Sequence, residues 1–171
     1  MTPEEIFNKL KDKFGESKIL SVHNNESAEV DICDPFINIE PLAMTEVAKF
    51  LKNDSELAFD QCCCISGVDL GDDLQAVYHL YSFNQKHKIC LKATTNRENP
   101  AIGTTALTWG ISGWLERETY DMFGIIFKNH PDHRRILLEE DWEGYPLRKD
   151  YEFPRYWRGM EVTPEEDYGT D

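Results

Sequence analysis

Apolar residues recur every three to four positions in two stretches of the N-terminal third, and each stretch predicts an amphipathic helix. The first helix is predicted to begin after Thr2, which can cap it, with Pro3 in its first turn, and to end at Gly15. The second is predicted to open at Pro41 and to close at Asn53. Both helices would present one apolar face to a common core.

Five other runs are rich in alternating apolar and polar residues and predict strands. The first two are expected to form a hairpin around a turn at 24–26, and the last three an antiparallel meander with short polar turns. The runs are 18–23, 28–33, 57–70, 74–83 and 87–93. The pattern therefore predicts an α/β fold of the α+β kind. We expect a mixed, largely antiparallel sheet of about four to five strands with three helices packed on it.

The third helix is predicted from Thr105 to Met122, ending near Gly124, after an irregular stretch at 94–103. On a helical wheel one narrow apolar face predicts the side that packs on the core. Glu118 lies near the centre of that face, and a buried carboxylate needs a cationic or hydrogen-bonding partner. The apolar face consists of Leu107, Ile111, Trp114, Leu115 and Met122, and the candidate partners of Glu118 are Arg134, Arg135 and Arg148.

Other charges of this helix are expected at its surface. Arg117 and Asp121 are four residues apart and could pair with each other, which on an exposed helix contributes only about half a kcal/mol. Glu116 is expected to point toward solvent or a partner. A charged helix face is more often solvated than functional, so this pattern alone does not identify a site.

The residues from Ile125 onward show no regular periodicity. Arg, Asp, Tyr and Trp are interleaved there, and a long irregular tail of this kind is usually covered by another chain. We therefore predict an α/β domain at 1–124 and an extended, partner-docking segment at 125–171. The prolines that punctuate this segment are Pro131, Pro146, Pro154 and Pro164.

The charge balance excludes several classes of partner. Asp and Glu number 32 against 18 Lys and Arg, giving a net charge of −14, which argues against nucleic acid and against anionic membrane surfaces. No stretch of about twenty apolar residues predicts direct membrane insertion, and the first residues do not form a secretory signal. The expected compartment is the cytoplasm.

Two residue groups could be taken for metal sites. Cys62-Cys63-Cys64 would point to alternating faces of a strand, so they are predicted to be reduced thiols rather than ligands of one ion. His130 and His133 could form a two-histidine site with an acid of the following segment, and a metal-dependent hydrolase is the corresponding alternative. The acids considered are Glu139, Glu140 and Asp141.

Three segments carry a resemblance to a known family. Residues 114–125 read WLERETYDMFGI, residues 130–137 read HPDHRRIL, and residues 144–151 read GYPLRKDY. The chain resembles the thirty-kilodalton subunit family of respiratory complex I over about 57–151. Upstream, 77–82 and Asn99-Pro100 agree with the family's sheet and pre-helix loop. It departs from the family's pattern at Tyr145, where histidine is common, and at Glu152, where proline is usual.

The resemblance implies a non-catalytic scaffold subunit of a proton-translocating NADH:quinone oxidoreductase. It implies no cofactor in this chain, with FMN, iron-sulfur clusters and quinone in other subunits. The implied partners are the large forty-nine-kilodalton (D-type) quinone-module subunit and the other hydrophilic subunits, at the cytoplasmic face of the bacterial inner membrane. The expected docking residues are Glu116, Arg117, Glu118, Asp121, Phe123, Gly124, His130, Arg134, Arg135, Leu137, Pro146, Leu147, Arg148, Lys149, Asp150 and Tyr151.

The motif leaves alternatives open. An equivalent subunit of a membrane-bound energy-converting hydrogenase, or of a ferredoxin- or deazaflavin-dependent oxidoreductase, would carry the same pattern. A general adaptor that binds through its sheet edge is a further possibility, and it predicts binding that survives charge reversal at Glu116, Arg117 and Glu118.

Overall fold

A computed structural model describes residues 1–24 and 34–162 of the chain. Its main sheet has five strands in the order β1-β2-β5-β4-β3, and every neighbouring pair is antiparallel except β2 and β5. The strands are β1 (Ile19–His23), β2 (Phe36–Ile39), β3 (Gln61–Asp69), β4 (Asp73–Ser82) and β5 (His87–Asn96). The predicted mixed, largely antiparallel sheet is confirmed. The strand expected at 28–33 lies outside the described residues, and β1 pairs with β2 instead.

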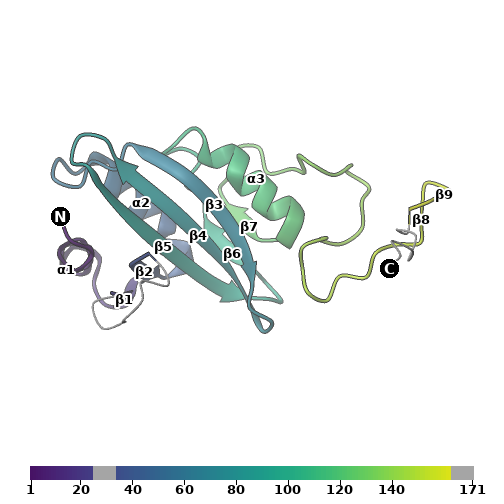
Figure 1. Ribbon diagram of the computed structural model, residues 1–171, viewed down its shortest axis with the longest axis horizontal. Coiled ribbons are helices and arrows are strands. Elements are labelled where there is room, and N and C mark those ends of the chain that lie inside the picture. The colour runs from purple at the N-terminus through teal and green to yellow at the C-terminus, as the bar shows by residue number, and fades with distance from the viewer. Residues whose placement is uncertain (25–33, 163–171) are drawn as a thin grey trace, which may run out of the picture.

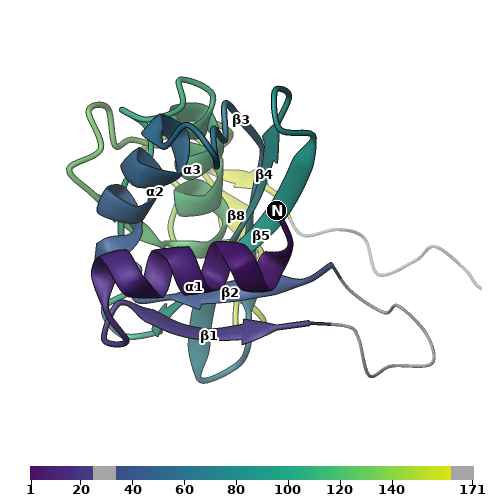
Figure 2. The ribbon, with the colours of Figure 1, turned by 90° about the vertical axis from the view of Figure 1, so that its left-hand side faces the viewer.

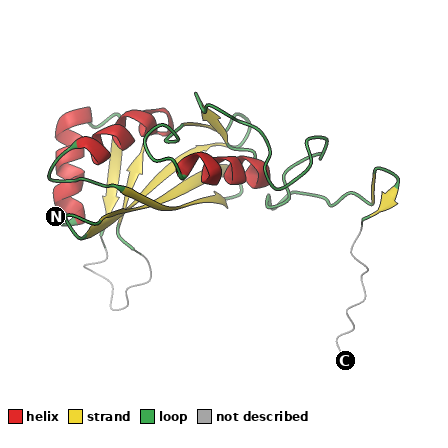
Figure 3. Cartoon of the chain, turned by 90° about the horizontal axis from the view of Figure 1, so that it is seen from above, coloured by secondary structure: helices red, strands yellow, loops and turns green. Residues whose placement is uncertain are grey.

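Three helices cover one face of this sheet (Figures 2 and 3). The first two match the predictions closely because their caps are encoded locally. In α1 (Pro3–Phe14) the Thr2 hydroxyl accepts the Glu5 N–H and the Glu5 carboxylate accepts the Thr2 N–H. A 3-10 turn, η1 (Pro41–Ala43), leads into α2 (Met44–Asn53). The third helix, α3 (Ser112–Phe123), begins seven residues later than the predicted start at Thr105, after a series of turns.

The core lies between the helices and the inner face of the sheet. Alternate residues of the strands point into it, and α1 and α2 add their apolar faces. Members with no exposed surface include Ile6, Leu10, Ile37, Met44, Leu51 and Tyr78. Burying each large apolar side chain contributes roughly 1.5–3 kcal/mol.

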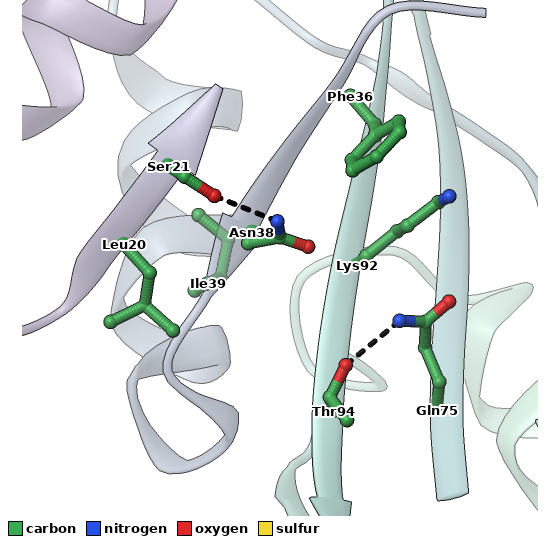
Figure 4. A pocket seen from close by; sticks show the side chains of 8 residues that line it. All are labelled: Leu20, Ser21, Phe36, Asn38, Ile39, Gln75, Lys92 and Thr94. Carbon is green, nitrogen blue, oxygen red and sulfur yellow. Dashed lines mark hydrogen bonds between the residues drawn. The ribbon is translucent and has the colours of Figure 1, made fainter. Parts of the chain in front are cut away.

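The opposite face of the sheet is open and carries a shallow hollow of about 410 Å³ (Figure 4). Its polar groups engage one another: the Asn38 amide donates to the Ser21 hydroxyl, and the Gln75 amide donates to Thr94. The Lys92 ammonium lies 3.5 Å from the centre of the Phe36 ring. These pairings stabilise the surface of the sheet.

A small parallel sheet joins the domain to the segment that follows it. Strands β6 (Ala101–Gly103) and β7 (Ile126–Lys128) pair in parallel on either side of α3 in the chain. Both lie in parts of the sequence whose pattern predicts irregular structure. Ile125 and Phe127 are buried in the core, so the first residues after Gly124 complete the domain.

Beyond β7 the chain first runs along α3 and then extends away from the domain (yellow in Figure 1), where it forms a hairpin of β8 (Tyr156–Trp157) and β9 (Met160–Glu161). Along 1–24 and 34–162, no helix is long and apolar enough to cross a membrane.

Candidate docking surface around the third helix

Part of α3, with the turn before it, faces the other way from the sequence prediction, whereas Leu115 of the predicted apolar face does pack against the core. Other residues of the face expected to pack on the core point outward: Trp114 is 60% exposed, Ile111 47%, and Glu118, at the centre of that face, is exposed as well. The inward face carries Ser112, Glu116 and Thr119 instead. The predicted burial of Glu118 is therefore wrong, and so is the predicted exposure of Glu116. An outward apolar face leaves a surface that another protein can cover.

Glu116 is fully buried and is held by the loop that precedes the helix. Its carboxylate accepts the Thr105 N–H and the Thr105 hydroxyl, each at 2.6 Å, and also the Thr104 hydroxyl. The His130 Nε2 atom lies 3.9 Å from it and 3.0 Å from the Gly113 carbonyl oxygen. Burial raises the pKa of Glu116, and the hydrogen bonds from Thr104 and Thr105 offset this only in part. Glu116 thus fixes the β6–α3 loop to the helix.

The predicted pairing of Arg117 with Asp121 is wrong, because each residue finds a partner in the tail. Arg117 donates to the carbonyl oxygens of Arg134 and Arg135 and contacts the Asp132 carboxylate at 3.2 Å. The backbone of the tail therefore wraps around this guanidinium, and Arg117 holds the chain beyond β7 against the helix.

Asp121 is fully buried and accepts four groups of that same segment. Its Oδ1 atom accepts Arg135 Nη1 at 2.6 Å, and its Oδ2 atom accepts the N–H groups of Ile136, Leu137 and Leu138 at 3.0, 2.7 and 2.9 Å. Burial alone would raise the pKa of Asp121, but these donors outweigh it and lower the pKa below its ordinary value. With four hydrogen-bond donors from residues 135–138, this charged carboxylate holds that part of the tail against α3.

A second anchor ties the next part of the tail to the end of the sheet. The Asp69 carboxylate accepts Arg97 Nη1 at 2.7 Å and the Lys149 N–H at 2.8 Å, and Arg97 also contacts Asp150. The Arg97 guanidinium holds the pKa of Asp69 well below its ordinary value. Arg148 donates to the Phe123 carbonyl oxygen at 2.6 Å. The residues that follow Pro146 are therefore fixed by groups at the ends of α3 and β3.

Large apolar side chains remain exposed on α3, on the turns before it and on the tail. Leu107 is 72% exposed, beside Ile111 and Trp114. On the tail the Trp142 ring lies 5.8 Å from Phe153 and 5.6 Å from Trp157, and its Nε1 donates to the Tyr151 hydroxyl. Aromatic rings in such clusters are frequent anchors of protein interfaces. The exposed apolar side chains of the tail are Leu137, Leu147, Phe153, Tyr156 and Met160.

The groups that could have formed a metal site have other partners. The His133 Nε2 atom accepts the Phe127 N–H, and Asp141 forms an ion pair with Arg158 at 2.8 Å. In the part of the chain that the structure describes, no group of three His, Cys, Asp or Glu residues lies close enough together to hold a metal ion. A β-bulge separates the cysteines: Cys62 is buried, whereas Cys63 is exposed at the edge of β3.

The predicted docking residues fall into two groups. One group is buried or half-buried and holds the chain to itself; it comprises Glu116, Arg117, Asp121, Phe123, Gly124, His130, Arg135 and Arg148. The other group is exposed and comprises Glu118, Arg134, Leu137, Leu147, Lys149 and Asp150, while Pro146 and Tyr151 are half-buried within the tail. Sequence reasoning missed four residues that hydrogen-bond to the predicted docking residues: Thr104 and Thr105, which bind Glu116, and Asp69 and Arg97, which bind Lys149 and Asp150. The adjacent threonines before the helix were the signal available for Glu116.

The chain has extensive similarity to known proteins. Residues 37–156 match the family described as respiratory-chain NADH dehydrogenase, 30 Kd subunit. The C subunit of the NADH-quinone oxidoreductase of Chloroherpeton thalassium is 40% identical over 164 residues, which cover 93% of this chain and 65% of that relative. The chain thus spans slightly less than two thirds of that relative's length. The protein of the same name from Chlorobium phaeobacteroides is 36% identical, with 90% of each chain covered.

A solved structure agrees on the fold. A chain of the membrane-bound sulfane sulfur reductase, an archaeal respiratory membrane complex, matches with a TM-score of 0.66 at 18% identity, over 87% of this chain and 85% of that chain. At this identity the likeness concerns the fold alone. The family match covers most of the described domain and the anchored part of its tail. The chain therefore belongs to the 30 Kd subunit family of the respiratory-chain NADH dehydrogenase.

Proposed function

We propose that the chain is a non-catalytic scaffold subunit of a proton-translocating NADH:quinone oxidoreductase. In this proposal it docks on the large D-type subunit of the quinone module, and FMN, iron-sulfur clusters and quinone reside in other subunits. Its place is the cytoplasmic face of the bacterial inner membrane, which it reaches through its partners. Relatives named as C subunits of NADH-quinone oxidoreductases support this assignment over the hydrogenase and ferredoxin or deazaflavin alternatives.

The observation that carries the proposal is the exposure of Trp114 on α3 while three charged residues of the same helix are buried. Burying these charges while Trp114, and Ile111 just before the helix, stay exposed is costly for an isolated protein, because apolar surface stays in water. The cost is recovered when a partner covers the exposed face. The buried charges then act indirectly, since they hold the tail in the conformation that presents its own apolar side chains.

The test uses the full chain coexpressed with the large quinone-module subunit. Trp114→Ala should weaken the complex by about 2 kcal/mol, or roughly thirtyfold, if Trp114 is a central contact. Phe83→Ala is the matched control, because Phe83 is 63% exposed and belongs to the β4–β5 turn rather than to α3 or the tail. Equal affinity of all three proteins, or no complex at all, would reject docking through this surface. The electron donor of the complex purified from membranes distinguishes the NADH enzyme from the hydrogenase-type alternatives.

A further inference from the structure

Strand β3 forms one edge of the main sheet and has a neighbouring strand, β4, on one side only. At the β3–β4 turn the Leu70 N–H donates to the Asp73 carbonyl oxygen at 3.0 Å, so the backbone groups of Leu70 point toward β4. Successive residues of an antiparallel strand point these groups to alternate sides. The N–H and C=O groups of Ile65 and Gly67 therefore point away from the sheet, toward its open edge.

A groove of about 260 Å³ runs along this edge. Its strand wall is formed by four consecutive residues, 64–67. Because consecutive residues of a strand point to opposite faces, four in a row line one hollow only along the free edge of the strand. The opposite wall is the side of α3 next to β3, which is mainly apolar, with one acid. It consists of Leu115, Glu118, Thr119, Met122 and Phe123, and Leu147 of the tail also lines the groove.

From Cys64 to Val68 the edge lacks the features that normally block strand addition. Proteins protect exposed edges with charged side chains, prolines or bulges. From Gln61 to Val68 the strand has no charged residue and no proline, and its bulge at Cys63 lies at the end away from the turn. Ile65 and Gly67 thus offer backbone groups that point to the open edge beside a mainly apolar groove.

We propose that this groove accepts an extended segment of a partner chain, which adds to β3 as a sixth strand. The segment would place apolar side chains against Leu115 and Met122 and a Lys or Arg beside Glu118. Its main-chain groups would pair with those of Ile65 and Gly67, as in other cases of strand addition. The proposal rests on the proposed function, because that function supplies the partner.

Charge identifies the occupant as a different protein. A second copy of this chain would bring another net charge of −14 to the groove. The chain's own last residues, 163–171, carry four acids and no Lys or Arg, so Glu118 would repel them as well. An apolar segment with a basic residue is the complementary ligand.

The test measures amide hydrogen exchange of the full chain, alone and within the complex isolated from native membranes through a tag on this chain. Single-residue resolution comes from fragmentation in the mass spectrometer. In the complex, exchange at Ile65 and Gly67 should be at least about tenfold slower than in the free chain. The exposed Cys63 thiol should also lose reactivity toward a maleimide. Glu118→Arg should weaken assembly about fivefold, whereas Asp12→Arg, an exposed charge reversal on α1, should have no effect.

The outcomes separate the two proposals. A complex that contains the large quinone-module subunit but leaves exchange at Ile65 and Gly67 unchanged would overturn strand addition and leave the proposed function standing. Protection of both amides in a complex without that subunit would support strand addition and reject the proposed partner. A chain that purifies alone would overturn both.

Discussion

Replacing Asp121 by Asn should release the tail from α3 without unfolding the domain. The Asn side chain keeps the shape of Asp121 but puts an NH₂ group in place of one carboxylate oxygen. That group faces either the Arg135 guanidinium or the three N–H groups of 136–138, all of which are donors. In either orientation a buried donor loses its acceptor.

The free-energy cost of this substitution follows from the burial of the Asp121–Arg135 ion pair. Removing one partner of a buried ion pair costs about 3–5 kcal/mol. Arg135 is 11% exposed in its side chain and keeps bonds to the carbonyl oxygens of Trp142 and Gly144, which favours the lower end, about 3 kcal/mol. If this free energy is lost from the local opening equilibrium of the tail, the fraction of molecules with the tail detached from α3 rises about 150-fold.

Limited trypsin digestion measures this population, because cleavage after Arg134 or Arg135 requires the segment to open. Asp132→Asn is the matched control: Asp132 is 52% exposed in its side chain and pairs with Arg117 and Arg134, so its loss should change cleavage by less than about fivefold. Cleavage of Asp121→Asn at the wild-type rate, or equal rates for the two variants, would refute the role assigned to Asp121.

Two further predictions concern the packing of α3. Glu116→Gln removes a carboxyl group whose pKa in the folded protein lies above its unfolded value of 4.5. The stability that this group contributes is therefore full below pH 4.5 and is lost as the pH rises through the folded pKa. In urea unfolding, the wild type should exceed the variant in stability by more near pH 4.5 than near neutral pH, and an equal difference at both would contradict the raised pKa. Gly67→Ala places a Cβ atom 2.3 Å from the Phe123 ring, which should cost about 2 kcal/mol in the same assay. Adding Phe123→Ala to that variant should then cost less than it does in the wild type, and strict additivity would exclude the contact.

The parts of the fold that are predictable are those whose signals are local. Thr2, Pro3 and Glu5 specify the start of α1 within four residues, and Pro41 marks the start of the second helical segment in the same way. The three long strands follow from alternation and turn residues, with ends shifted by up to four residues. Family membership is predicted from the motifs at 114–151 and is confirmed by the match at 37–156.

The orientation of α3 could not be predicted because it depends on residues far away in the sequence. The wheel assigns the apolar face to the core, but Asp121 and Arg117 find their partners at 132–138, and Glu116 finds its own at Thr104 and Thr105. With these contacts the polar face is the more favourable one to bury. The partition of the chain at Gly124 and the docking roles of the motif residues stay predictions.

The position of β7 bears on how the protein is made. Translation releases the main sheet and all three helices before Ile125 and Phe127, which fill the remaining space in the core. The nascent chain therefore cannot complete this core until the residues just after Gly124 have left the ribosome.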